Sequence, residues 1–431
     1  MTAEPEKKIQ WQDRRPRARK KPSAWRQQRQ RLRESRAGAT RRARSVVGER
    51  LAPVSKRWAA FRQWYEANGK WTKPVAAVLL IGLALFLPYT ADVFEVPLWV
   101  ELATSGSVLA RVMLFALFAL GLNVVVGFAG LLDLGYVAFW AIGAYTAGIL
   151  TGAQDYAAAL SAGAENPVEP EWQMWMWLLF LVALGVAVIA GIVLGSPTLR
   201  LRGDYLAIVT LGFGEIVRIT ANNLDSFTGG PRGIRGIPHP AIKVGGINVE
   251  WGTLIDIKYY WLLLAFVVLW IIAINMLDKS RIGRAWVAIR EDEVAAAAMG
   301  VPVVRMKLAA FAIGACTAGV GGVVYAEQVT FINPPTFSLI QSILILSMVV
   351  IGGMGSIAGS ILGAALIVLL PEIFRPLEDY RFFLFGFALI VVMIFRPQGL
   401  LPSKRREAEL MAGTEESSIE EIESRSGAAS A

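Results

Sequence analysis

Apolar runs much longer than a soluble core would use are the feature that most constrains this chain. An α-helix rises about 1.5 Å per residue, so about 20 apolar residues cross the hydrocarbon of a membrane. The run Leu109–Thr151 would make roughly 64 Å of helix, about twice that thickness. It therefore has to fold back, and the stretch from Gly127 to Gly130 is where we expect the interruption. The sequence predicts an all-α polytopic membrane protein.

The same measure applied along the whole chain predicts about ten transmembrane helices. The run Ser338–Leu370 also exceeds one membrane thickness and is interrupted by Gly352, Gly353 and Gly355, so it counts as two passes, the first short enough to be re-entrant. The remaining passes are Val75–Asp92, Trp175–Gly195, Tyr205–Asn222, Tyr259–Leu277, Leu308–Tyr325 and Phe382–Phe395. Trp175–Gly195 is the fourth pass along the chain, and we expect it to end before Ser196-Pro197.

Charge divides the chain into three parts. Residues 1–73 hold 22 Lys or Arg against 6 Asp or Glu, a net charge of +16 in a chain of net charge +9. We expect this basic extension to be mostly disordered, with an interfacial helix near residues 54–71. Residues 74–402 form the transmembrane domain, and the acidic tail 403–431 is expected to be disordered.

The distribution of Lys and Arg predicts which loops face the cytosol. With ten passes, the basic extension, the island 280–307 and Lys404-Arg405-Arg406 fall on one face, which the positive-inside rule assigns to the cytosol. Residues 152–173 carry acidic residues and no Lys or Arg, and fall on the opposite face. We therefore expect both termini in the cytosol. The basic extension serves as an anchor, or binds anionic lipid or a protein; a nucleic-acid partner is the least favoured reading because no nucleic-acid-binding fold accompanies the arginines.

Several function classes are excluded by what the sequence lacks. One cysteine, Cys316, and one histidine, His239, leave no material for a disulfide framework, a Cys/His metal site or a histidine-based catalytic triad. The only Gly-Lys pair, Gly69-Lys70, lacks the preceding glycine of a phosphate-binding loop. We expect no enzyme activity and no cofactor in this chain, so uphill transport would take its energy from a partner.

The charged island Ser280–Lys307 is the place where such a partner could act. We expect one short helix outside the membrane, with Glu291, Asp292 and Glu293 in its first turn, where the helix dipole favours negative charge. Ala295 to Ala298 favour the helix, and Gly300 with Pro302 ends it.

Polar residues inside membrane passes are costly and therefore informative. Three readings stay open for each of them: a structural pair or cap, a lining of the translocation path, or direct substrate contact. The candidates are Asn123, Asp133, Glu215, Arg218, Glu327 and Gln328. Glycines at four-residue spacing, Gly355, Gly359 and Gly363, allow close helix packing either within the chain or at a dimer seam.

Six motifs in order make the chain similar to a known family. They are GLNVVVGFAGLLDLGYVAFWAIGAY (121–145), PTLRLRGDYLAIVTLGFGEIVR (197–218), TGGPRGI (228–234), GRAWVAIREDEVAAAAMGV (283–301), VIGGMGSIAGS (350–360) and FRPQGLLP (395–402). Together they closely resemble the LivM-type permease subunit of branched-chain amino acid ABC importers. The resemblance runs from about Leu109 to Pro402 and leaves the basic extension and the acidic tail outside.

The resemblance implies an ABC-importer permease fold in the bacterial inner membrane. It implies a second LivH-type permease subunit, two cytosolic ATPase subunits that bind ATP and Mg, and a periplasmic substrate-binding protein. It places the cytoplasmic coupling helix at Glu291–Gly300 and the family's Gly-rich break at Gly352–Ser356. The candidate ATPase-coupling residues are therefore Arg290, Glu291, Asp292, Glu293, Ala295, Ala296 and Gly300.

The sequence says less about the transported ligand than about the family. Similar permeases serve urea, short amides and other amino acids, and most selectivity is expected to reside in the binding protein. We expect that protein to dock on Thr228–Pro240 and Phe331–Phe337. A membrane scaffold acting through its basic tail is the alternative from a different class.

Overall fold

The computed structural model describes residues 105–152, 176–198, 204–244, 247–250 and 257–373, with a few single positions at 82, 88 and between 380 and 401. The chain divides into two compact units, Met1–Leu85 and Phe86–Ala431, and the elements below belong to the second. The expected interfacial helix near 54–71, nearly all of the passes Val75–Asp92 and Phe382–Phe395, the loop 153–173 and the tail 403–431 lie outside the described residues.

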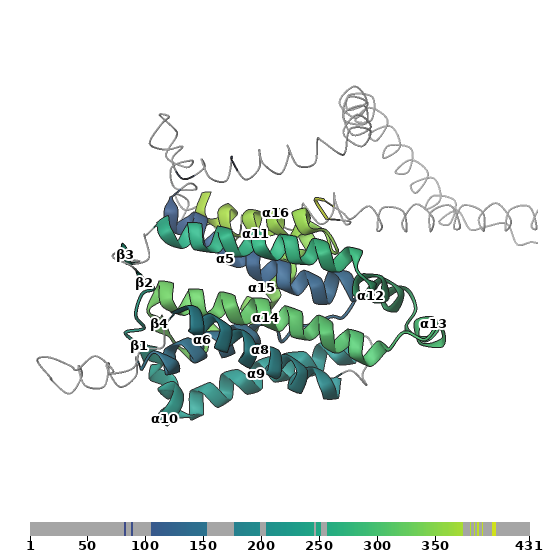
Figure 1. Ribbon diagram of the computed structural model, residues 1–431, viewed down its shortest axis with the longest axis horizontal. Helices are drawn as coiled ribbons and strands as arrows, with labels where there is room; N and C mark the ends of the chain where they lie inside the picture. Colours follow the sequence, from purple (N-terminus) through teal and green to yellow (C-terminus); the bar gives the residue numbers. More distant parts are fainter. Residues whose placement is uncertain are drawn as a thin grey trace, which may run out of the picture. The chain divides into compact units, whose positions relative to one another are not determined.

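The described chain is a bundle of apolar helices (Figure 1). Five segments are long and apolar enough to cross a membrane, and two shorter apolar helices accompany them. This establishes a mostly helical, multi-pass architecture, while the count of ten remains a prediction. The helices are α5 (Gly106–Asn123), continued by the π-helix η2 (Val124–Phe128), α6 (Val137–Leu150), α8 (Met176–Thr198), α9 (Asp204–Asn223), α11 (Ile257–Lys279), α14 (Val303–Val329), α15 (Leu339–Gly352) and α16 (Ile357–Ile373).

Helix α14 is the centre of the bundle. It packs against α6 and α8 on one side and against α5 on the other, as Figure 1 shows. Its glycines permit this approach, because a Cβ on Gly322 would lie 2.8 Å from the backbone nitrogen of Ala144 in α6. A Cβ on Gly314 would lie 2.6 Å from the side chain of Val125. The small-residue face of α14 is therefore used within the chain.

The apolar run from 338 to 370 is divided by a glycine turn. Gly353 and Gly355 have φ angles of 121° and 76°, which side chains with a Cβ rarely adopt, and α15 ends there. Helix α16 then packs back on α15, with a Cβ on Gly359 only 2.9 Å from the Gly352 carbonyl carbon. The amide of Leu401 donates to the Gly352 carbonyl at 2.9 Å, so a carbonyl freed at the end of α15 is satisfied by a segment much later in the chain.

The fourth pass does not end before Ser196-Pro197 as expected. Helix α8 continues through Pro197 to Thr198. Proline lacks the amide hydrogen that would bond the carbonyl four residues earlier, on Val193. The Ser196 hydroxyl donates to that carbonyl at 3.2 Å instead, so the proline is accommodated in the last turn.

Two small antiparallel strand pairs lie at one end of the bundle, which the all-α prediction did not include. The strand β1 (Ile234–Arg235) pairs with β4 (Phe331–Ile332), and β2 (Ala241–Val244) pairs with β3 (Ile247–Glu250). Figure 1 shows this strand end opposite the end that carries the short helices α12 and α13.

Candidate functional site

Helix α12 (Arg281–Glu291) is the first half of the charged island. It begins at Ser280, whose hydroxyl accepts hydrogen bonds from two backbone amides of the first turn. Trp286 is 1% exposed, and its Nε1 donates to the Met306 carbonyl at 2.7 Å. This bond attaches α12 to the beginning of α14, so α12 belongs to the packed structure rather than to a loose loop.

Helix α13 (Glu293–Ala298) is the second half, and the prediction of one helix is wrong. The backbone of Asp292 is extended, and its Oδ1 accepts the amides of Val294 at 2.8 Å and Ala295 at 3.0 Å. An aspartate that caps a new helix in this way ends the preceding one, so Glu291 lies in the last turn of α12 and not in a first turn. Gly300, at a φ of 85°, follows the end of α13 as expected.

The hairpin formed by α12 and α13, residues 280–300, is held to α14 by an ion pair. The Lys307 ammonium lies 2.8 Å from the Glu293 carboxylate, and only 4% of the Lys307 side chain is exposed. A buried ammonium needs such a partner, because desolvation of an unpaired charge is costly. Ala296 is 4% exposed and packs within the chain, whereas Ala295 faces outward.

The tip of the hairpin is apolar and exposed. Val294 and Met299 are 62% and 86% exposed, and Val304, at the start of α14, is 58% exposed. Exposed large apolar side chains on a charged loop are typical of an interaction site. Between Val294 and Met299, the small residues Ala295, Ala297 and Ala298 are exposed as well.

Arg290, one of the expected coupling residues, points into the bundle and away from that tip. Its Nη1 donates to the Gly127 carbonyl at 2.9 Å, and its Nη2 lies 3.8 Å from Glu291 Oε1. The first of these bonds connects the hairpin to the end of η2, at the position where the long run Leu109–Thr151 is interrupted.

Asn123, expected near a helix break, joins the two breaks to each other. The side chain is fully buried, its Oδ1 accepts the Gly355 amide at 2.8 Å, and its Nδ2 approaches the Ser356 carbonyl at 3.4 Å. A Cβ on Gly127 would lie 2.9 Å from Gly355 Cα, so the two backbones are in contact. Nothing in the spacing of the sequence could place Asn123 against residues more than 200 positions away.

Asp133 lies in the segment between η2 and α6, where irregular backbone leaves polar groups to be satisfied. It is 1% exposed, its Oδ1 accepts the Gly135 amide at 2.8 Å, and its Oδ2 has no hydrogen-bond partner among the described residues. The Thr210 hydroxyl, beside it, accepts the Leu134 amide at 3.0 Å. The small cavity that they border holds about 10 Å³, roughly the room of one water molecule, so it does not hold an amino acid.

Glu327 and Gln328 lie near the strand end of α14, 2% and 6% exposed. The Glu327 carbonyl accepts the Tyr259 hydroxyl at 2.9 Å and lies 3.0 Å from His239 Nδ1. These bonds fix the strand-end loop to α11 and α14. The Glu327 Oε2 atom has no hydrogen-bond partner among the described residues.

Glu215 and Arg218 form an ion pair on α9. The Arg218 Nε lies 2.9 Å and 3.0 Å from the two Glu215 oxygens, and Nη2 donates to Oε1 as well. Their side chains are 39% and 31% exposed, so the pair faces outward from the described bundle. The six polar candidates are therefore found at separate places, and the structure does not unite them in one binding site.

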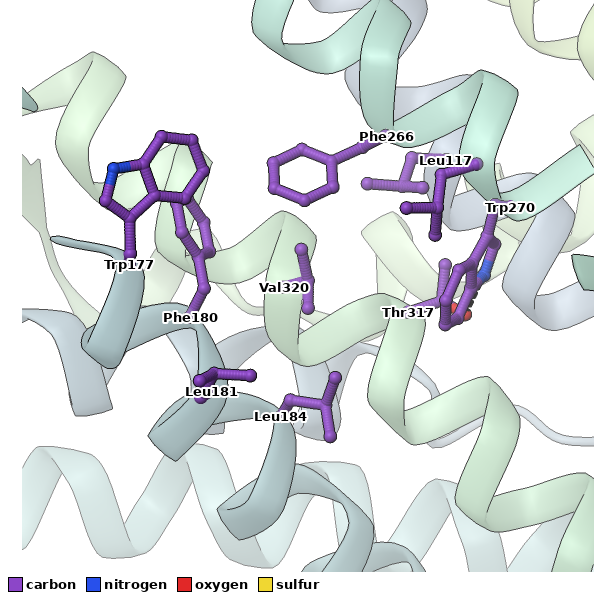
Figure 2. A pocket seen from close by; sticks show the side chains of 10 residues that line it. Leu117, Trp177, Phe180, Leu181, Leu184, Phe266, Trp270, Thr317 and Val320 are labelled. Carbon is purple, nitrogen blue, oxygen red and sulfur yellow. Dashed lines mark hydrogen bonds between the residues drawn. The ribbon is translucent and has the colours of Figure 1, made fainter.

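A larger cavity of about 350 Å³ lies between α5, α8, α11 and α14 (Figure 2). Its walls are apolar and include Trp177, Phe180 and Phe266. The one polar pair in the wall, Trp270 Nε1 and the Thr317 hydroxyl, is already joined by a hydrogen bond. A zwitterionic amino acid needs partners for its ammonium and carboxylate groups, so this cavity does not suit such a ligand.

Comparison with known proteins identifies the family. Residues 105–393 match the family described as branched-chain amino acid transport system / permease component. The chain belongs to this family. The high-affinity branched-chain amino acid transport system permease proteins LivM of Salmonella typhimurium and Escherichia coli are 40% and 39% identical over 335 residues, which cover 73% of this chain and 74% of each relative.

A more distant relative extends the likeness to archaea. The probable branched-chain amino acid transport permease protein LivM of Methanocaldococcus jannaschii is 25% identical over 327 residues, 68% of this chain and 91% of that protein. No solved structure matches. The resemblance drawn from the six motifs to a LivM-type permease is thereby confirmed.

Proposed function

We propose that the chain is the transmembrane permease subunit of an ATP-driven, binding-protein-dependent importer of branched-chain amino acids. The substrate class comes from the names of the two relatives that share about 40% of their aligned residues with it. The multi-pass helical bundle suits a permease, and we place it in the bacterial inner membrane with both termini in the cytosol.

The observation that carries the ATP-driven part is the exposed apolar tip of the α12–α13 hairpin. The hairpin is held to α14 through Trp286 and Lys307, so force applied at its tip is delivered to the central helix of the bundle. We assign the tip, around Val294 and Met299, to a groove on a cytosolic ATPase subunit. ATP and Mg are bound by two such partner subunits, and this chain contributes no catalytic residue.

The strand end is the proposed docking surface for the periplasmic binding protein. The two segments expected to meet that protein, Thr228–Pro240 and Phe331–Phe337, are joined by the β1–β4 pair, with Ile234 opposite Ile332. The Arg235 guanidinium lies 5.4 Å from the centre of the Phe331 ring, so the two segments form one surface. A second, LivH-type permease subunit would complete the pathway beside this chain.

Uptake by the whole assembly tests the proposal. The chain is purified with its second permease and two ATPase subunits, placed in proteoliposomes, and supplied with the binding protein and radiolabelled leucine, isoleucine, valine or urea. The proposal expects ATP-dependent accumulation of the three amino acids. Accumulation of urea alone would assign the chain to the urea and short-amide branch, and an assembly without any ATP-dependent uptake would refute the importer.

A further inference from the structure

The backbone at the end of η2 presents a carbonyl that its own helix does not use. In a regular helix the Gly127 carbonyl would accept the amide of Leu131. That amide bonds the Val125 carbonyl at 3.0 Å instead, because the helix widens into a π-turn before it ends. The donor that meets Gly127 comes from Arg290, more than 160 residues later in the chain.

The fit of Arg290 against this turn depends on a second glycine. Gly130 has a φ of 70°, and a Cβ there would lie 3.2 Å from Arg290 Cβ and 3.3 Å from its Cδ. The arginine stem thus lies along a turn that has no side chain, and its guanidinium reaches the free carbonyl. Arginine suits this position because its donors lie at the end of a long stem and its charge strengthens the bond.

The same turn is in contact with the second helix break. Asn123, the residue directly before η2, accepts the Gly355 amide, and Gly127 lies against the Gly355 backbone. A path of direct contacts therefore runs from the hairpin through Arg290 to η2, and from η2 to the turn between α15 and α16. Both are interruptions at which a helix can change direction.

We infer that Arg290 is a positioning residue of the transport cycle, which transmits displacement of the α12–α13 hairpin to the two helix breaks through its bond to the Gly127 carbonyl. This inference rests on the proposed function and deepens it. It assigns Arg290 to the transmission of force inside the chain, while the exposed residues of the tip dock the ATPase.

The test compares Arg290→Met with Arg281→Met in the complete assembly. Methionine keeps most of the stem at position 290 and removes the donor. Arg281, exposed at the start of the same helix, controls for the loss of one positive charge. Two quantities are measured: the number of ATP molecules hydrolysed per leucine transported, and hydrogen exchange of the backbone amides of residues 124–131.

In R290M we expect the ratio of ATP to leucine to rise at least fivefold and the amides of η2 to exchange faster, with ATPase subunits still co-purifying. In R281M both quantities should stay at the wild-type level. R290K, which keeps the charge on a shorter stem, serves as a second variant should R290M be recovered poorly, and its ratio should rise less.

The inference requires that the ratio of ATP to leucine and the amide exchange of residues 124–131 change together in each variant. A raised ratio with unchanged exchange, faster exchange with a wild-type ratio, or equal behaviour of R290M and R281M would overturn the inference. Loss of the ATPase subunits from R290M would also overturn it, since Arg290 would then be a docking contact. Failure of the proposed function is distinct, because the wild-type assembly itself would then show no ATP-dependent uptake.

Discussion

The amide side chain of Asn123 satisfies a backbone group that the chain cannot satisfy locally. The Gly355 amide lies in a turn between two helices and donates to Asn123 Oδ1 at 2.8 Å in a fully buried setting. Replacing Asn123 with leucine leaves that amide without its partner, which costs about 1–3 kcal/mol. We expect N123L to lower the melting temperature of the purified protein in detergent.

Asn275→Leu is the matched control for this change, because Asn275 is exposed and its Nδ2 donates within its own helix, to the Ile271 carbonyl. We expect N275L to melt close to the wild-type temperature. Equal melting temperatures for N123L and the wild type would mean that the link between the two breaks adds nothing to stability.

The coupling free energy between Glu215 and Arg218 depends on whether the outer face of α9 lies in water or is shielded from it. Each single replacement by leucine leaves one charge unpaired, so each should lower the folded yield more than the double replacement does. A double-mutant cycle measures the coupling free energy. A pair in water couples by about 0.2–1 kcal/mol, whereas breaking a pair shielded from water costs about 3–5 kcal/mol. Additive single effects would show that the two side chains do not support each other.

At the scale of the element, the helices could be predicted from the sequence more reliably than their ends. Run length and glycine positions predicted the division of Leu109–Thr151 near Gly127 and of Ser338–Leu370 at Gly353, because hydrocarbon thickness and positive φ are local constraints. The π-turn at η2 and the strand pair β1–β4 depend on partners far along the chain, so no local pattern indicates them.

In the candidate site too, local features could be predicted from the sequence, whereas contacts between distant residues could not. The acidic and alanine-rich residues of the hairpin were identifiable from the sequence, but their division between two helices depends on one carboxylate, that of Asp292, accepting two amides. Trp286 and Lys307 fix the hairpin to α14, yet a tryptophan and a lysine near a membrane surface also suit an exposed loop. That the Arg290 side chain points into the bundle could not be predicted without knowing that the Gly127 carbonyl is left unbonded by its own helix.

Helix α13 is short, so its cap should matter more than its other charges. Asp292→Ala removes an acceptor of two amides and should cost about 0.5–2 kcal/mol of helix stability. Glu291→Ala removes an exposed charge from the last turn of α12 and should cost less. We expect D292A to lower leucine uptake partially and E291A to leave it near the wild-type rate, measured in matched amounts of assembly. Equal losses would mean that charge, rather than capping, is the important property.

Ala295 and Ala296 are both candidate coupling residues from the sequence, but their substitutions should have different effects. Ala295 is exposed on the outward face of α13, so Ala295→Leu should obstruct a docking partner and abolish stimulation of ATP hydrolysis by the loaded binding protein, without changing the melting temperature. Ala296 is 4% exposed, so Ala296→Leu should overpack its buried surroundings and cost about 1–3 kcal/mol of stability. Normal coupling in A295L would show that the ATPase does not dock on α13.

For the whole molecule, the central expectation is that the hairpin and the acidic loop 152–173 lie on opposite sides of the membrane. Figure 1 shows the hairpin and the strands at opposite ends of the bundle, a separation that helices of 18 to 27 residues impose. Helix α6 ends at the strand end of the bundle, where a Cβ on Gly148 would lie 3.0 Å from the Ile234 side chain.

Cysteine labelling of intact cells tests this arrangement, because the single native Cys316 is buried and contributes little background. Met299 is 86% exposed at the tip of the hairpin, and Ala164 lies in the acidic loop, outside the described residues. A membrane-impermeant maleimide should label Ala164→Cys in intact cells and Met299→Cys only after lysis. The reverse pattern would place the hairpin in the periplasm, where no ATPase could reach it. The predicted topology has an odd number of passes between residues 164 and 299. Labelling of both positions in intact cells would mean that this number is even, which would contradict the topology that the distribution of Lys and Arg predicts.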